Sequence, residues 1–144
     1  MNQIALAFVK AREICKLAAY QDSGGIWTVG WGATGPGIVA GTVWTQAEAD
    51  ADLEHRLGLV EMSVSHLLGN GSFSVQQRAA LISFEYNCGA VALAQSHLLQ
   101  FVLKRNWIAA AKAFLQFDHA AGTELQGLLK RRMYEGALFL EGSA

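Results

Sequence analysis

The chain has 144 residues, of which 52% are hydrophobic, 10% aromatic and 16% charged, a composition typical of a packed globular protein. This length suits one domain with its own core, or two small lobes that share a helix. The formal net charge of −1 disfavours strong attraction to nucleic acid or to an anionic membrane. No secretory signal and no run of about 18 apolar residues is visible, so we expect a protein that accumulates in the cytoplasm without stable membrane insertion.

The cysteine and histidine content argues against a disulfide framework or a metal site. Cys15 and Cys88 are two thiols in a chain expected to stay in the cytoplasm, where such thiols are usually reduced. We therefore expect neither a metal nor any other cofactor. The histidines lack ligand spacing such as H-E-x-x-H and are expected to be surface or hydrogen-bonded residues: His55, His66, His97 and His119.

The first predicted element is a helix over residues 3–15, because apolar residues recur there at three- and four-residue steps. Glu13 would lie near the end of this helix, in a row with Val9 and Leu17. Its side chain would then be walled in part by aliphatic groups.

A change of character follows from Tyr20 to Gly41, where glycine, threonine, tryptophan and valine alternate between turn clusters. This pattern predicts a small twisted antiparallel sheet. One turn is expected at residues 22–25 and another at residues 34–37.

The remaining elements are predicted to be helices. Thr45 and Glu48 have the spacing of a capping box, which opens a long helix ending near Leu68. A second capping box at residues 74–77 opens an apolar helix that ends at residues 87–89. Further helices are predicted over residues 96–104, 106–117 and 124–140.

Together these elements predict an α+β fold that is mostly helical. A small β-containing lobe, about residues 18–44, would be joined by the long helix to a larger helical lobe. That larger lobe would contain about residues 70–144 and the N-terminal helix. We expect a single domain over residues 1–144, with a cleft between the lobes.

Two further motifs have an ordinary structural interpretation. Residues 30–35 match G-x-G-x-x-G, but Pro36 and Gly37 follow and no helix can begin before about Thr45, so a tight hairpin is favoured over a dinucleotide site. The run at residues 130–132 is Lys-Arg-Arg. On a chain that is not basic overall, a helix face whose arginines pair with carboxylates is favoured over a phosphate-binding patch.

Glu13 and Asp22 are the candidate catalytic pair. Their ordinary interpretation is a helix-exposed glutamate and a turn aspartate. However, a carboxyl walled by aliphatic groups is suited to hold a proton, whereas one in a glycine-rich solvated turn is suited to stay ionised. Two carboxyls with such different surroundings can act as the acid and the base that cleave a glycosidic bond.

These residues resemble the phage lysozyme family, the endolysins of glycoside hydrolase family 24. In that family a Glu, an Asp and a Thr stand at the separations of Glu13, Asp22 and Thr28. The resemblance covers nearly the whole chain. Its other motifs lie at residues 83–89, 96–99, 107–114, 121–122 and 127–132.

The resemblance implies a lysozyme-like fold and a muramidase that hydrolyses the β-1,4 bond between N-acetylmuramic acid and N-acetylglucosamine of peptidoglycan. Glu13 would be the general acid. Asp22 and Thr28 would position and activate the attacking water, so that the anomer is inverted. Tyr86 and Asn87 fall where the family lines its cleft and would contact sugars. Inversion implies carboxyl groups about 6.5–9.5 Å apart.

Other expectations follow from the same resemblance. Ala33 stands where many members have a histidine that is usually structural, and a core arginine of the family corresponds to Arg131 or to its neighbour Arg132. No amino-terminal export anchor is visible. The resemblance therefore implies an endolysin that accumulates in the host bacterial cytoplasm and reaches the periplasm and cell wall through a holin-type lesion. We expect a monomer, since nothing in the sequence argues against one.

Two alternatives remain open at the level of sequence. A lytic transglycosylase needs one catalytic acid but no positioned water, and the presence of Asp22 and Thr28 argues against it. A catalytically silent wall-binding module on the same fold is disfavoured by the intact Glu13.

Overall fold

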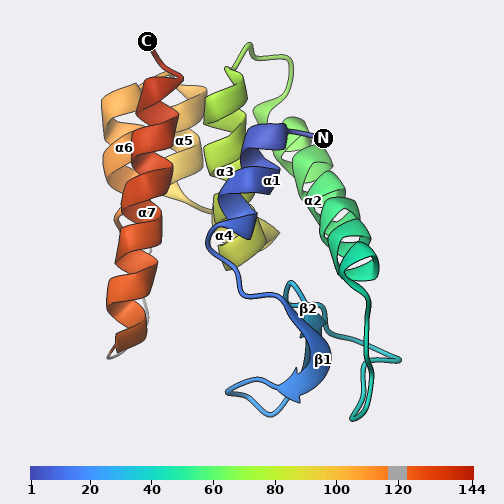
Figure 1. The fold of residues 1–144 in the computed structure, drawn as a ribbon. Coiled ribbons are helices and arrows are strands. Elements are labelled where there is room, and N and C mark those ends of the chain that lie inside the picture. The colour runs from blue at the N-terminus through green and yellow to red at the C-terminus, as the bar shows by residue number, and fades with distance from the viewer. Residues whose placement is uncertain (117–122) are drawn as a thin grey trace.

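The computed structural model describes residues 1–116 and 123–144, with side chains for all of these except residues 123–125. In those residues the chain forms seven helices and one two-stranded antiparallel sheet. Figure 1 shows the helices gathered into one bundle, with the hairpin beneath it and α2 running alongside. In chain order the elements are α1 (Gln3–Lys10), β1 (Lys16–Gln21), β2 (Trp27–Gly30), α2 (Gln46–Leu68), α3 (Val75–Cys88), α4 (Ala90–Ala94), α5 (His97–Leu103), α6 (Trp107–Phe114) and α7 (Thr123–Glu141).

Both predicted capping boxes are present at the starts of the helices that they open. At α2, the Thr45 hydroxyl accepts from the amide of Glu48 at 3.1 Å, and the Glu48 carboxylate accepts from the amide of Thr45 at 2.7 Å. At α3, Ser74 and Gln77 exchange the same pair of bonds at 3.1 and 2.9 Å. Each box provides hydrogen-bond acceptors for two backbone amides at the start of the helix, which would otherwise be unpaired.

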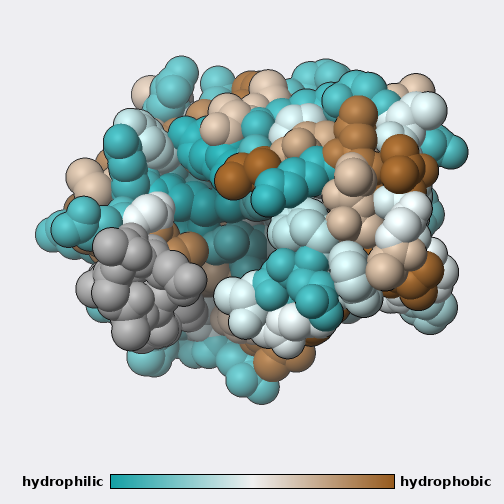
Figure 2. All heavy atoms as spheres, turned by 60° about the horizontal axis from the view of Figure 1, so that its bottom comes forward, coloured by the Kyte–Doolittle hydropathy of each residue, from teal (hydrophilic) through white to brown (hydrophobic). Residues whose placement is uncertain are grey.

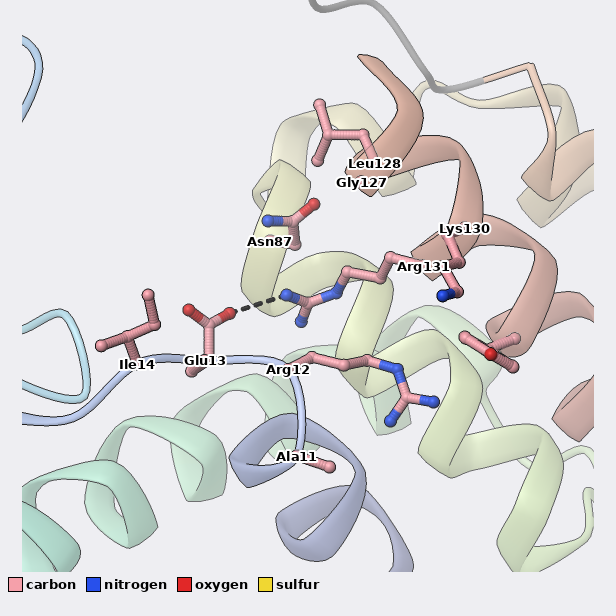
Figure 3. A pocket seen from close by; sticks show the side chains of 10 residues that line it. Ala11, Arg12, Glu13, Ile14, Asn87, Gly127, Leu128, Lys130 and Arg131 are labelled. Carbon is pink, nitrogen blue, oxygen red and sulfur yellow. Dashed lines mark hydrogen bonds and ion pairs between the residues drawn. The ribbon is translucent and has the colours of Figure 1, made fainter. Parts of the chain in front are cut away.

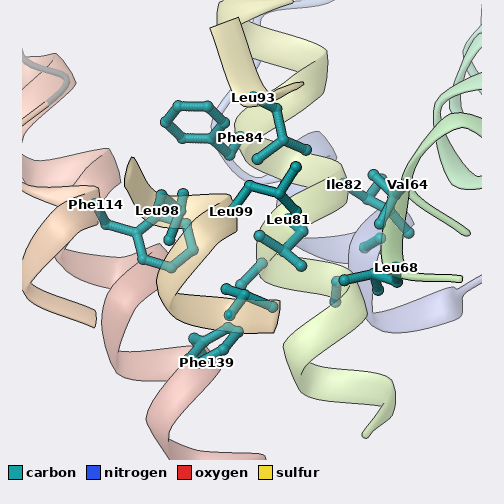
Figure 4. Close-up of a cluster of buried hydrophobic side chains, with 14 of the residues drawn as sticks. Val64, Leu68, Leu81, Ile82, Phe84, Leu93, Leu98, Leu99, Phe114 and Phe139 are labelled. Carbon is teal, nitrogen blue, oxygen red and sulfur yellow. The ribbon is translucent and has the colours of Figure 1, made fainter. Parts of the chain in front are cut away.

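Helix α3 lies at the centre of the bundle and is buried around much of its circumference, as expected for a helix that contacts neighbours on several sides. It packs against α1, α2, α4 and α7. Phe84 on α3 meets Phe114 edge to face at a ring separation of 5.9 Å, and Phe139 lies 5.8 Å from Phe114 (Figure 4). All three rings are fully buried, and each such side chain contributes about 1.5–3 kcal/mol through burial.

The first helix is shorter than predicted, since α1 ends at Lys10 rather than near residue 15. The amides of Arg12 and Glu13 both donate to the carbonyl of Val9 at 2.9 Å, which tightens the chain into a turn. Arg12 also donates back to the carbonyl of Phe8 at 2.9 Å, occupying a carbonyl that another helical turn would have used. Glu13 therefore lies in a turn beyond the helix, and the predicted row of Glu13 with Leu17 does not form.

The sheet begins earlier and ends earlier than predicted. It lies at residues 16–30 instead of spreading over residues 20–41. The turn expected at residues 22–25 joins its strands, and the turn at residues 34–37 is also present, closed by a bond from the Ile38 amide to the Gly35 carbonyl. Beyond β2 the chain makes isolated bridges, including one between Val43 and Ala18.

The later helices follow the prediction, with small shifts at their ends and one addition. The short helix α4 was not predicted. The last residue predicted for the helix at 106–117 lies outside the described residues, as do His119 and the motif at residues 121–122. No helix in the described part of the chain is both long enough and apolar enough to cross a membrane. The predicted fold class, α+β and mostly helical with a small hairpin lobe, is confirmed, whereas the single domain over residues 1–144 stays a prediction.

Candidate active site

Glu13 stands in the turn between α1 and β1 and points at the side of α7 (Figure 3). Its Oε1 atom accepts from Arg131 Nη1 at 2.7 Å, and 24% of the Glu13 side chain is exposed. Among the described residues, no other side chain bonds to this carboxylate. One oxygen is therefore fixed by a charge-assisted bond, while the other is open to a ligand.

Arg131 is held in turn by groups beneath it. Its Nε atom lies 3.4 Å from Glu135 Oε1, one helical turn along α7. Its Nη2 atom donates to the hydroxyl of Ser83 on α3 at 3.2 Å. The guanidinium is buried, and its donors are shared among three partners, so its direction is set before any ligand arrives.

Arg132 completes the buried cluster from the next position on α7. Its Nη2 atom donates to Glu135 Oε1 and to Asn87 Oδ1, each at 3.0 Å, and its Nη1 atom lies 2.6 Å from the sulfur of Cys88. Arg132 Nε and Glu135 Oε2 form an ion pair at 2.8 Å whose alignment does not make a hydrogen bond. The prediction that the arginines of the run at 130–132 pair with carboxylates is confirmed.

Glu135 is the acidic centre of this cluster and is fully buried. Burial raises the pKa of its carboxyl group, against the opposing effects of Arg132, Ser83 and Arg131. Ser83 donates its hydroxyl proton to Glu135 Oε1 at 2.6 Å. The cluster thus joins α3 and α7 directly behind the Glu13–Arg131 pair.

Asp22 is positioned by local backbone. Its Oδ1 atom accepts from the amide of Gly24 at 2.8 Å and from the amide of Ile26 at 2.9 Å, the pattern by which an aspartate closes its own turn. The side chain is half-buried. No described residue bonds to Oδ2, which leaves one carboxylate oxygen free to act on a ligand or a water.

Thr28 lies on β2 and is 4% exposed. Its hydroxyl donates to the carbonyl of Ile26 at 3.0 Å, so the lone pairs of the oxygen remain available as acceptors. Asp22 and Thr28 therefore belong to one hairpin, whose turn and strand fix them relative to each other.

A pocket of about 790 Å³ opens beside Glu13. It lies between the end of α1, the end of α3 and the first half of α7, and Figure 3 shows its lining side chains. The face of the molecule seen in Figure 2 is hollowed, with mostly hydrophilic residues in the hollow. The pocket is lined by Ala11, Arg12, Glu13, Ile14, Asn87, Gly127, Leu128, Lys130, Arg131 and Tyr134.

The predicted site residues divide between this pocket and its surroundings. Glu13 and Asn87 line it, and Asn87 lies next to the Glu13–Arg131 pair in Figure 3. Asp22 and Thr28 are on the hairpin and are not among the lining residues. Tyr86 is half-buried, and its hydroxyl bonds to the backbone carbonyl of Trp31 at 3.0 Å. The roles of all five residues stay predictions.

Some of the residues around the site carried little signal in the sequence. Glu135 and Ser83 were not singled out, because these two bonded residues lie 52 positions apart in the sequence. A weak signal exists for Glu135, which stands three and four positions after two arginines on one helix. Arg131 was indicated by the basic run at residues 130–132 and by the family resemblance, but neither signal pairs it with Glu13.

The other motifs behave as ordinary structure. Gly30, Gly32 and Gly35 have φ values of 62°, 98° and 124°, so the G-x-G-x-x-G match marks a tight chain path, and no helix begins until Gln46. Cys15 and Cys88 are free thiols. The described residues contain no group of three or more His, Cys, Asp or Glu side chains arranged to hold a metal ion.

The fold and the site define a lysozyme-like α+β protein with an arginine–carboxylate cluster beside its pocket. A family model described as phage lysozyme matches residues 10–135. The chain therefore belongs to the phage lysozyme family.

Individual relatives agree with this assignment. The chain is 37% identical to the endolysin of Salmonella phage P22 over 136 residues, which is 92% of each protein. It is 32% identical to the endolysin of Lactococcus phage c2 over 146 residues, covering 96% of this chain but 59% of that relative's length. Among solved structures, the muramidase domain of SpmX from Asticcacaulis excentricus matches with a TM-score of 0.84 and 30% identity, over 94% of each chain.

Proposed function

We propose that this protein is a phage-type endolysin, a muramidase that hydrolyses the β-1,4 bond between N-acetylmuramic acid and N-acetylglucosamine in bacterial peptidoglycan. Membership of the phage lysozyme family supports the reaction class. The observation that carries the proposal is Glu13, a carboxyl at a pocket wall, held by Arg131 at one oxygen and open at the other.

In this reaction Glu13 donates a proton to the leaving oxygen of the glycosidic bond. Positioning by Arg131 supports this role because general acid catalysis needs the acid within hydrogen-bonding distance of the leaving group. The guanidinium also favours the carboxylate that remains after the proton has been given, which stabilises the product side of the step.

Asp22 and Thr28 position and activate the attacking water on the opposite face of the sugar. The free Oδ2 of Asp22 takes one proton from that water as its oxygen attacks, and the Thr28 oxygen accepts a hydrogen bond from the hydrogen that the water retains. A water attacking from the face opposite the leaving group inverts the anomeric carbon, and such enzymes keep their two carboxyls about 6.5–9.5 Å apart. Asn87, which lines the pocket, and Tyr86 contact the bound sugars in this proposal.

The partner is the glycan strand of peptidoglycan, and the protein acts as a monomer. It accumulates in the host bacterial cytoplasm and reaches the periplasm and cell wall through a holin-type lesion. The endolysins of phages P22 and c2 among the relatives support a role in release of phage from the host.

Mass spectrometry of the sugar ends released from purified peptidoglycan tests the proposal. Hydrolysis leaves new reducing muramic acid ends, and in ¹⁸O-labelled water each new end carries one label. Anhydro-muramic ends would instead identify a lytic transglycosylase. If strands are bound but not cut, the protein is a silent wall-binding module and the proposed reaction is wrong.

A further inference from the structure

The hairpin is tied to the helical bundle through Trp31, the residue that directly follows β2. Its indole Nε1 donates to Asp50 Oδ1 at 2.8 Å, at the start of α2. The same oxygen accepts from Gln46 Nε2 at 3.0 Å and lies 3.2 Å from Lys10 Nζ on α1. The bonds from Trp31 and Gln46, followed by the bond from Lys10, lower the pKa of Asp50. Asp50 is therefore an ionised acceptor that joins the hairpin to two helices.

The backbone of Trp31 is held from the other side by Tyr86 of α3. The Tyr86 hydroxyl donates to the carbonyl of Trp31 at 3.0 Å and accepts from Arg56 Nη1 at 2.6 Å. Arg56 also reaches the Trp31 carbonyl at 3.4 Å and pairs with Asp52 at 2.7 Å. Burial raises the pKa of Tyr86, so its hydroxyl keeps the proton that it donates.

These contacts form one link between the two halves of the proposed site. Trp31 follows Thr28 by three residues on the same chain segment. Tyr86 lies on the helix that carries Ser83, whose hydroxyl bonds to Arg131, the partner of Glu13. A connected path of short contacts thus runs from the acid, through α3, to the strand that bears the water-binding threonine.

We propose that Tyr86, Arg56 and Asp50 are positioning residues for the reaction. They fix the hairpin relative to Glu13 through hydrogen bonds to Trp31. Tyr86 and Arg56 donate to its carbonyl, and Asp50 accepts from its indole. This inference rests on the proposed function, and it gives the Tyr86 hydroxyl a task other than contact with a sugar. The Tyr86 hydroxyl donates its proton to the Trp31 carbonyl and accepts a hydrogen bond from Arg56, so its donor and one acceptor position are already used within the protein.

The size of the effect follows from the sensitivity of catalysis to geometry. A displacement of about 1 Å in a group that binds the reacting atoms can lower a rate by about 100-fold. Loss of the Tyr86 hydroxyl leaves the Asp50–Trp31 bond in place, so we expect a partial displacement and a fall in kcat of about tenfold. KM should stay within about twofold, since the pocket residues beside Glu13 are unchanged.

Tyr86→Phe tests the link, because it removes the hydroxyl and keeps the ring that packs against the core. The matched control is Ser65→Ala, which removes another side-chain hydrogen bond to α3, the one from Arg78 at 3.2 Å, without touching the hairpin. We expect Ser65→Ala to keep the wild-type kcat. Equal loss of kcat in both variants, or no loss in Tyr86→Phe, overturns the inference.

A double-mutant cycle with Thr28→Val separates positioning from general destabilisation. Valine keeps the shape of threonine and suits a strand, so the fold should survive. If Tyr86 acts by placing the hairpin, then Tyr86→Phe costs much less in the Thr28→Val background than in the wild type. An unchanged cost in that background means that Tyr86 does not act through the hairpin site.

Amide hydrogen exchange provides a readout that does not depend on activity. Tyr86→Phe should speed exchange across residues 27–33 by about fivefold or more and leave α5 unchanged. If wild type releases no sugar ends, the proposed function fails, and positioning for that reaction fails with it. Faster exchange would still show that Tyr86 holds the hairpin, so the two failures are distinguishable.

Discussion

Glu13 and Asp22 are held by two regions that work in different ways. Asp22 is fixed by amides two and four residues further along the chain, so its place depends on one short turn. Glu13 depends on Arg131, which is 118 positions away in the sequence and is itself held by Glu135 and Ser83. The place of Asp22 thus depends on local contacts, whereas Glu13 is positioned by a buried network that exists only in the folded bundle.

This difference indicates where each region tolerates change. A substitution in the hairpin turn perturbs a few local bonds that water can in part replace. A substitution in the arginine–carboxylate cluster leaves a buried charge without its partner, and that costs several kcal/mol. The largest effects on stability should therefore come from the helical region, although both regions supply proposed catalytic groups.

The strongest way to separate chemistry from structure is Glu13→Gln. Glutamine keeps an oxygen that accepts from Arg131, so the fold should be retained, while the carboxyl proton that we propose Glu13 donates is lost. We expect activity on peptidoglycan to fall by at least about 100-fold. Glu54→Gln, at an exposed position on α2, is the matched control and should keep wild-type activity. If Glu13→Gln clears outer-membrane-permeabilised cells as fast as the wild type, Glu13 is not the acid.

Arg132→Met tests the helical region directly. Arg132 supplies the shorter contacts to Glu135, so its loss leaves the buried Glu135 carboxylate with only the longer contact to Arg131 as a cationic partner. We expect the free energy of unfolding in urea to fall by about 3–5 kcal/mol. Lys130→Met, on the exposed side of the same helix, should change it by less than about 0.5 kcal/mol. Equal changes in the two variants would show that the buried cluster does not govern stability.

The same distinction explains which features could be predicted from the sequence. The capping boxes at Thr45 and Ser74 depend on residues three positions apart, and both were predicted correctly. Helix α1 was predicted too long because apolar residues continue at helical spacing as far as residue 15. Pairing with β2 overrides that local preference, and the register joins Lys16 to Gly30.

The cluster around Glu13 could not be predicted in the same way. Ser83 is one serine among several, and nothing near it in the sequence indicates a bond to Glu135. Glu13 and Asp22 were chosen for their different local surroundings, and the family spacing supported them and added Thr28. Their supporting residues require the packing of α3 against α7, which no local pattern encodes.

Asp22→Asn tests the local character of the hairpin. Asparagine retains an acceptor for the amides of Gly24 and Ile26 and is itself favoured in such turns, so the melting temperature should stay within about 2 °C. The charge proposed to activate water is lost, and we expect activity to fall about 10- to 100-fold. Asp22→Ala loses the turn bonds as well, and should also lower stability by about 1 kcal/mol. Full activity in Asp22→Asn would remove Asp22 from the proposed mechanism.

The smallest effect concerns Glu85, a buried carboxyl on α3 that contrasts with Glu135. Glu85 is 4% exposed, its Oε2 atom has no hydrogen-bond partner in the described structure, and no arginine is paired with it. Burial raises the pKa of Glu85, and a hydrogen bond from Ser63 opposes this only in part. A raised pKa in the folded state means that the protonated form is favoured there. The contribution of protonated Glu85 to the free energy of unfolding is complete at pH values below the pKa that Glu85 has in the unfolded chain. It is lost as the pH rises through the higher pKa that Glu85 has in the folded protein.

Glu85→Gln should remove this loss, because glutamine stays neutral at every pH and can still accept a bond from Ser63. We expect the variant to match the wild type near pH 4 and to be more stable by about 1 kcal/mol at pH 7–8. Thermal melts of both proteins across that range measure the difference, with Glu54→Gln as the exposed control. If the difference in stability between Glu85→Gln and the wild type is constant with pH, or shrinks as the pH rises, then burial does not favour the protonated form of Glu85.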